Sequence, residues 1–189
     1  MKTEIKIIKT LIENKSLTIR EISQKINSDY KITHIAVQRL IEKDIIFIET
    51  IGKSSLCRLN NNFTFEIYKA EDEKKQDLLK NKNIKQLYKE ISARIKTSFF
   101  IFIVFGSYAK KKQTKSSDID LILISNEENF EKTIDNITSI LPLKTHILVF
   151  TEEEFIRMKN SKERNVVKEA IENNIILYGT ENYYKLKNA

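Results

Sequence analysis

The spacing of hydrophobic residues predicts three short helices at the start of the chain. Isoleucine and leucine recur every three or four positions across residues 2–14, as in an amphipathic helix. A second helix is predicted over residues 19–26, because Thr18 and Glu21 have the spacing of a capping box. A third helix is predicted over residues 32–43. The residues expected to face inward on this third helix are Ile35, Leu40 and Ile41.

The pattern then changes to the period of two that is typical of β-strands. Residues 46–50 and 55–59 are predicted strands, and Gly52 between them is a hairpin signal. Three helices followed by a hairpin resemble a winged helix-turn-helix domain, which we expect over residues 1–68. Asp44 stands where such domains usually carry glycine, and aspartate tolerates the left-handed conformation of that position.

A polar segment follows the hairpin. Residues 69–96 are rich in Lys, Glu, Asp, Asn and Gln, while their hydrophobic residues recur at helical intervals. We predict a helical linker that is broken near residues 81–83. Two interpretations stay open for it: a solvated linker helix, or a helix that also forms a homodimer contact.

Strands and helices alternate in the remainder of the chain. The continuous apolar run Phe99–Phe105 predicts a buried strand, and helices are predicted over residues 129–140 and after a capping box at Thr151. Further strands are predicted at residues 118–124, 144–150 and 175–178. A mixed sheet with flanking helices is therefore expected over residues 97–189, and the expected fold class is a two-domain α+β or α/β protein.

Composition excludes several classes of protein. The longest apolar run is Phe99–Phe105, and seven residues are too few to cross a bilayer. The single cysteine, Cys57, excludes an internal disulfide framework and a multi-cysteine zinc site. The sequence has no P-loop, no glycine-rich dinucleotide-binding loop and no HExxH motif. We expect a soluble cytoplasmic protein with no membrane partner.

The charge balance indicates a polyanionic partner. The chain carries 33 Lys and Arg against 26 Asp and Glu, a net charge of +7. The first 70 residues hold 12 basic and 8 acidic residues, so the excess per residue is higher there, and double-stranded DNA is the expected partner. Protein docking by the same domain is the alternative. The candidate DNA-contacting residues are Thr33, His34, Gln38 and Arg39 on the third helix, with Lys53 and Arg58 in the hairpin.

Gly106 is the most informative of only three glycines. A strand leads into Gly106-Ser107, where the missing Cβ lets the backbone approach a ligand closely, and Ser107 is expected to open a short helix. After ten intervening residues the chain reads Asp118-Ile119-Asp120. Its two carboxylates project from one face of a strand, and a hard divalent cation such as Mg²⁺ would remove their mutual repulsion.

These residues and their spacing resemble the signature of the DNA polymerase beta-like nucleotidyltransferase superfamily, in its minimal form, over residues 98–178. The resemblance implies that Asp118 and Asp120 bind Mg²⁺. It implies that Gly106 and Ser107 hold the phosphates of an NTP, with ATP as the expected nucleotide. The implied reaction is in-line transfer of a nucleoside monophosphate to a hydroxyl on a protein or RNA, with loss of pyrophosphate. Relatives that pair small nucleotidyltransferases with toxins suggest an antitoxin-like role.

One position departs from this family. Active relatives commonly carry a third acidic residue on a following strand, and His146 occupies the matching position here. A neutral imidazole is able to act as a base but is a poorer Mg²⁺ ligand than a carboxylate, and a hydrogen-bonded structural role is the alternative.

Four lysines lie between the two motifs. The expected nucleotide contact among them is Lys111, and a solvated, open loop is the alternative interpretation. These lysines are Lys110, Lys111, Lys112 and Lys115.

Two functions from different classes follow. The first is an enzyme that transfers a nucleoside monophosphate to a hydroxyl with Asp118, Asp120 and His146 as catalytic residues, and that is placed or regulated by its DNA-binding domain. The second is a DNA-binding transcriptional regulator whose transferase domain is degenerate and serves as a nucleotide sensor or a scaffold. The aspartate pair favours the first function, and His146 favours the second.

Overall fold

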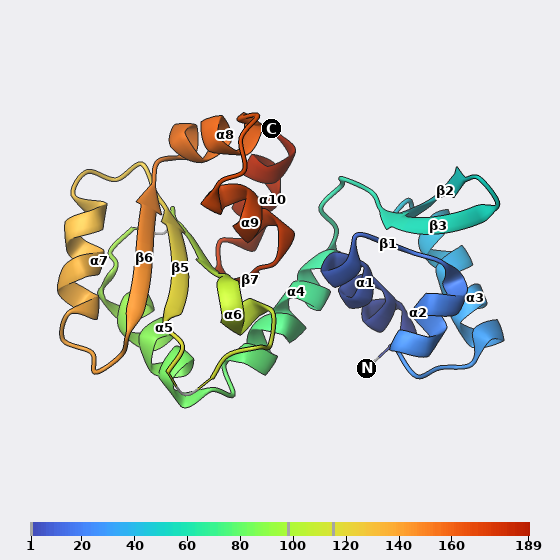
Figure 1. Cartoon of the computed structure of the whole chain (residues 1–189), viewed down its shortest axis with the longest axis horizontal. Helices are drawn as coiled ribbons and strands as arrows, with labels where there is room; N and C mark the ends of the chain where they lie inside the picture. Colours follow the sequence, from blue (N-terminus) through green and yellow to red (C-terminus); the bar gives the residue numbers. More distant parts are fainter. Residues whose placement is uncertain (1, 98, 115) are drawn as a thin grey trace. The chain divides into compact units, whose positions relative to one another are not determined.

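The computed structural model describes residues 2–97, 99–114 and 116–189. The chain divides into two units, Met1–Glu71 and Asp72–Ala189, each with its own core (Figure 1). Ser98, the expected start of the nucleotidyltransferase-like region, and Lys115 lie outside the described residues. No helix in the described part of the chain is long and apolar enough to cross a membrane.

The first unit begins with three helices whose apolar faces pack together. These helices are α1 (Thr3–Asn14), α2 (Ile19–Lys25) and α3 (Tyr30–Glu42). The capping box predicted for α2 is present, because Thr18 Oγ1 accepts the amide N–H of Glu21 while the Glu21 carboxylate accepts the N–H of Thr18. These bonds lower the pKa of the Glu21 carboxyl, with the Thr18 backbone N–H as the main cause.

A three-stranded antiparallel sheet completes the first unit. Its strands are β1 (Ser16–Leu17), β2 (Ile46–Ile51) and β3 (Ser54–Leu59), in the order β1-β3-β2. The predicted hairpin is confirmed, with Gly52 in its turn at a φ of 60°. Asp44 has the expected left-handed conformation, at a φ of 55°. Its carboxylate and its backbone carbonyl both accept hydrogen bonds from the Asn60 side-chain amide, which stabilises this turn.

The inward face of α3 differs from the prediction. The helix begins at Tyr30, because the Asp29 side chain caps it by accepting the N–H groups of Lys31 and Ile32. Ile35 was expected to face inward, and this expectation is wrong, since its side chain is 45% exposed. Leu40 is buried as expected and Ile41 is half-buried, and the other buried residues of α3 are Thr33, Ala36 and Val37.

The segment expected as a linker forms two helices, α4 (Phe65–Leu78) and α5 (Lys82–Arg94). Asn81 caps α5 and marks the predicted break. Helix α5 is not a solvated linker helix, because its apolar face lies in the core of the second unit. The fully buried residues on this face are Ile84, Leu87 and Ile91.

The second unit is built on a four-stranded mixed sheet. Its strands are β4 (Ile101–Val104), β5 (Ile119–Ile124), β6 (Thr145–Phe150) and β7 (Ile175–Tyr178), in the order β6-β5-β4-β7. Strands β5 and β6 are parallel, and the other two pairs are antiparallel. Strand β4 is shorter than predicted at its start, where Phe99 lies outside the strand and is 79% exposed.

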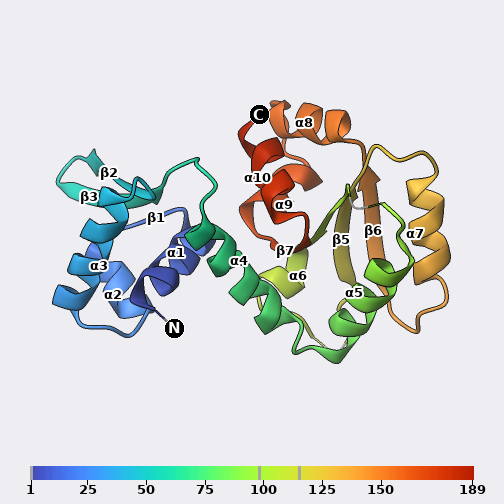
Figure 2. The ribbon, with the colours of Figure 1, turned by 180° about the vertical axis from the view of Figure 1, so that it is seen from behind.

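Helices flank this sheet. Between β4 and β5 lies the single turn of α6 (Gly106–Ala109), and α7 (Phe130–Thr138) packs with α5 in one continuous apolar core. The chain ends with α8 (Glu152–Asn160), α9 (Val166–Glu172) and α10 (Thr180–Asn188). These three helices lie together in both views (Figures 1 and 2), with α8 in contact with β6 and α10 in contact with β4. The capping box predicted at Thr151 opens α8.

Alanine substitution at two left-handed glycines tests where packing excludes a side chain. Gly52 and Gly179 have φ values of 60° and 75°, and alanine strains such a backbone by about 1 kcal/mol. At Gly52 the new methyl group meets nothing within 4 Å, whereas at Gly179 it lies 2.4 Å from the carbonyl oxygen of Phe100. We expect Gly52→Ala to lower the free energy of unfolding by about 1 kcal/mol and Gly179→Ala by about 3 kcal/mol. Urea unfolding followed by circular dichroism measures both, and equal losses would contradict the packing of Gly179.

Candidate active site

The candidate site is centred on the contact between Gly106 and Asp120. The antiparallel ladder of β4 and β5 pairs Val104 with Leu121, and the N–H of Phe105 donates to the carbonyl of Asp120 at 3.0 Å. The chain then turns at Gly106 with a φ of 62°. A Cβ on Gly106 would lie 2.1 Å from Asp120 Oδ2 and 2.9 Å from Cγ. Only glycine therefore fits at this position beside the carboxylate.

In the Asp-Ile-Asp motif the two aspartates are exposed or partly exposed and the isoleucine is buried, as predicted. Asp118 precedes β5 and is exposed, while the Asp120 side chain on β5 is 28% exposed. Ile119, between the two aspartates, is 3% exposed, and Leu121, after Asp120, is 0% exposed, so both are buried. The strand thus holds the Asp120 carboxylate against Gly106, while Asp118 lies just before the strand begins.

His146 lies beside Asp120, on the neighbouring strand. Parallel pairing of β5 with β6 sets Asp120 opposite His146. Nδ1 of the imidazole is 3.4 Å from Asp120 Oδ1, and the His146 side chain is 61% exposed. The parallel register thus places His146 beside the Asp120 carboxylate.

The residues fit a magnesium ion better than a metal that needs a full set of protein ligands. Within the described ranges, no group of three or more His, Cys, Asp or Glu side chains is placed to hold a metal. Mg²⁺ is commonly bound through one or two carboxylates, with water and substrate phosphates completing its shell. Asp118 is exposed and the Asp120 side chain is 28% exposed, so both carboxylates are accessible for this use.

The lysine loop is partly tied to α9. Lys110 Nζ donates to Glu169 Oε1 at 2.8 Å. This hydrogen bond lowers the pKa of the Glu169 carboxyl. Lys110 thus has a carboxylate partner within the unit. The expected nucleotide contact, Lys111, is exposed and has a φ of 55°.

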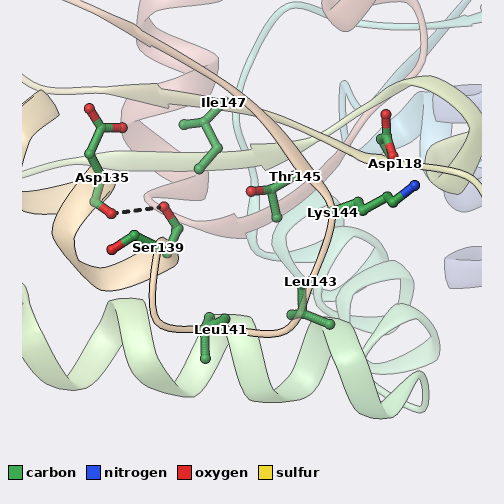
Figure 3. Close-up of a pocket in the computed structure, with 9 residues that line it drawn as sticks. Asp118, Asp135, Ser139, Leu141, Leu143, Lys144, Thr145 and Ile147 are labelled. Carbon is green, nitrogen blue, oxygen red and sulfur yellow. Dashed lines mark hydrogen bonds between the residues drawn. The ribbon is translucent and has the colours of Figure 1, made fainter.

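A groove of about 710 Å³ extends from Asp118 along the start of β6 to the end of α7. Figure 3 shows Asp118 and Lys144 at one end of this groove and Asp135 with Ser139 at the other. Sequence reasoning missed the α7 side of the groove. No motif marks it, because Asp135 and Ser139 approach the site only through the packing of α7 beside β6.

The candidate DNA-contacting residues are not equally accessible. Thr33 is a correction: it is fully buried, and its hydroxyl donates to the carbonyl of Asp29, so it cannot reach a nucleic acid. Arg58 Nε lies 2.6 Å from Glu49 Oε2 in an ion pair across the hairpin. His34 is half-buried, with its ring centroid 6.1 Å from that of Tyr30. The remaining candidates, all of them exposed, are Gln38, Arg39 and Lys53.

Comparison with protein families supports the assignment of the second unit. Residues 84–177 match the family model described as the nucleotidyltransferase domain. The chain therefore contains a nucleotidyltransferase domain, and the matched residues run from within α5 to β7. No curated protein and no solved structure matches the chain.

A double-mutant cycle tests the contact at the centre of the site. Gly106→Ala places a methyl group against the Asp120 carboxylate, and we expect it to destabilise the protein by about 3 kcal/mol. In an Asp120→Ala background the two closest atoms are gone and only Cβ, at 3.2 Å, stays near the new methyl group. The same glycine substitution should then cost at least about 1 kcal/mol less. Additive losses in urea unfolding would argue against this contact.

Proposed function

We propose that the second unit transfers a nucleoside monophosphate from an NTP, with ATP as the expected donor, to a hydroxyl group on a protein or an RNA. The observation that carries this proposal is the contact between Gly106 and Asp120, which sets a carboxylate directly against a bend in the backbone. The nucleotidyltransferase-domain match over residues 84–177 supports the same reaction class.

Asp118 and Asp120 are the residues that would hold Mg²⁺. When bound, the ion neutralises charge on the carboxylates and phosphates and stabilises the charge that develops on the transferred group. Asp118 is exposed and Asp120 is partly exposed, so both carboxylates are open to a nucleotide that approaches from solvent.

Ser107 and Lys111 are proposed to orient the phosphates. Ser107 follows Gly106 in α6, so its hydroxyl is available close to the carboxylates as a donor to a phosphate oxygen. Lys111 adds positive charge at the end of the same turn. These contacts would hold the α-phosphate in line with the attacking hydroxyl, which is most of what an enzyme contributes to this kind of transfer.

His146 is proposed to accept the proton of the attacking hydroxyl. With its proton on Nδ1, the imidazole donates toward Asp120 Oδ1, and the lone pair is left on Nε2. A base oriented in this way by a neighbouring carboxylate follows the general logic of acid–base catalysis. The high exposure of the ring leaves room for a large acceptor.

The first unit is proposed to be a winged helix-turn-helix domain that binds double-stranded DNA. Its element order supports this proposal, because three helices are followed by an antiparallel hairpin. The exposed side chains of Gln38 and Arg39 would face the major groove, and Lys53 in the turn of the hairpin would contact a phosphate.

A second candidate function is a DNA-binding regulator whose second unit binds nucleotide without transferring it. The position of His146 favours this candidate, because it stands where a third carboxylate is expected.

Carboxylate substitutions test the transferase proposal. With labelled ATP, Mg²⁺ and cell extract, we expect wild-type protein to transfer label and Asp118→Asn or Asp120→Asn to transfer at least about 100-fold less, because the charge that holds the ion is lost. Glu131→Gln, which removes an exposed carboxylate on α7, is the control and should transfer normally. Wild-type protein that binds ATP without any transfer would support the regulator instead, and transfer that persists in both variants would exclude this site.

Salt dependence tests the DNA-binding proposal. We expect Arg39→Ala and Lys53→Ala to weaken duplex binding, each with a decrease of about 1 in the slope of log affinity against log salt concentration. Lys132→Ala removes an exposed lysine from α7 and should leave the slope unchanged. Electrophoretic mobility shifts at several salt concentrations measure these slopes. Slopes that match wild type in both variants would rule out docking through α3 and the hairpin.

A further inference from the structure

The outward face of α3 has an isoleucine at its centre. With about 100° of rotation per residue, the position opposite the buried side of α3 falls between Lys31, Ile35 and Gln38. Lys31 and Gln38 are both exposed, and the Ile35 side chain is 45% exposed. Ile32, one turn earlier, is 55% exposed. An apolar pair thus lies within a polar and basic surface.

This apolar pair borders a hollow in the first unit. A cavity of about 450 Å³ lies between the start of α1 and α3, with Ile32, Ile35 and Arg39 among its lining residues. The pair is therefore accessible to a ligand rather than covered by the packing of the unit. Neither isoleucine belongs to the buried core that the first unit forms.

We propose that Ile35, assisted by Ile32, recognises the 5-methyl group of thymine in the major groove of DNA. Thymine is the only base that presents a methyl group there, and apolar side chains contact it favourably. Gln38 lies one turn after Ile35, and its amide has the donor and acceptor that match the N6 and N7 groups of adenine. The first unit would accordingly select A·T base pairs. This inference rests on the proposed DNA-binding function.

Charge complementarity favours DNA over a protein as the occupant of this face. Lys31 and Arg39 are exposed beside the isoleucines, and both would meet phosphates. The only acidic residue of α3 is Glu42, which is exposed one turn after Gln38, so the helix carries two basic residues, Lys31 and Arg39, against one acidic residue. Glu4, at the start of α1, is 3.7 Å from Lys43 Nζ, which also pairs with Glu66 Oε1 at 3.2 Å and therefore offsets only part of the Glu4 charge.

Uracil substitution isolates the proposed contact, because deoxyuridine differs from thymidine only by the missing methyl group. Full-length protein is first used to select tight-binding sequences from a pool of random duplexes, and we expect A·T-rich sites. The selected duplex is then compared with the same duplex in which uracil replaces thymine. Each contacted methyl group should account for about a fourfold difference in affinity for wild-type protein.

Two variants complete the experiment. Ile35→Ser should bind the thymine and uracil duplexes equally, because the apolar partner of the methyl group is gone. Ile140→Ser removes another exposed isoleucine, 58% exposed and located in the second unit, and should keep the wild-type preference. Circular dichroism checks that both variants fold, which is expected for exposed positions.

Each other outcome overturns a defined statement. If wild-type protein binds no duplex even at low salt, the proposed DNA-binding function itself fails. If it binds duplex DNA but does not distinguish thymine from uracil, or if Ile35→Ser keeps the distinction, DNA binding stands and the methyl-reading inference fails. If Ile35→Ser instead converts a dimer to a monomer in sedimentation without DNA, the face is a contact between copies of this chain, which also overturns the inference.

Discussion

The close approach of Gly106 to the Asp120 carboxylate is the constraint on which the candidate site depends. The two residues meet because β4 and β5 form an antiparallel ladder that ends with the hydrogen bond from Phe105 to the Asp120 carbonyl. The left-handed bend at Gly106 then brings the backbone to the carboxylate with no room for a Cβ. Any side chain at position 106 would displace Asp120 or the strand. Glycine has only a hydrogen atom there, and the carboxylate can therefore lie beside the start of α6.

The remaining chemistry is arranged around that carboxylate. Parallel pairing of β5 with β6 places His146 on the other side of Asp120, and the lysine loop that follows α6 is partly held by the pair of Lys110 with Glu169. Asp120 thus has one oxygen toward an imidazole and the other toward a glycine. In the proposed site, the histidine therefore lies beside one of the two carboxylates that would bind the ion.

The two units differ in the kind of side chain that they expose at their candidate binding surfaces. In the second unit the polar residues of the site lie at the end of a strand whose alternate residues are fully buried, so the core sets their direction. In the first unit the outward face of α3 carries isoleucines that are not part of the buried core. Both sets include side chains that are exposed at the surface of their unit.

Local patterns in the sequence determined most of the elements and the choice of candidate site residues. Some features depend on residues within a few positions of one another, and the sequence alone was sufficient to predict them. These are the capping boxes at Thr18 and Thr151, the hairpin at Gly52 and the Asp-Ile-Asp alternation. Which residues of α3 face the core could not be predicted in this way. Asp29 starts the helix two residues early, and the packing against α1 and α2 then decided that Thr33 is buried and Ile35 exposed. Only the tertiary structure placed α5 in a core, Gly106 against Asp120 and α7 beside the groove, because these contacts join segments that are far apart in the chain and have no local signal.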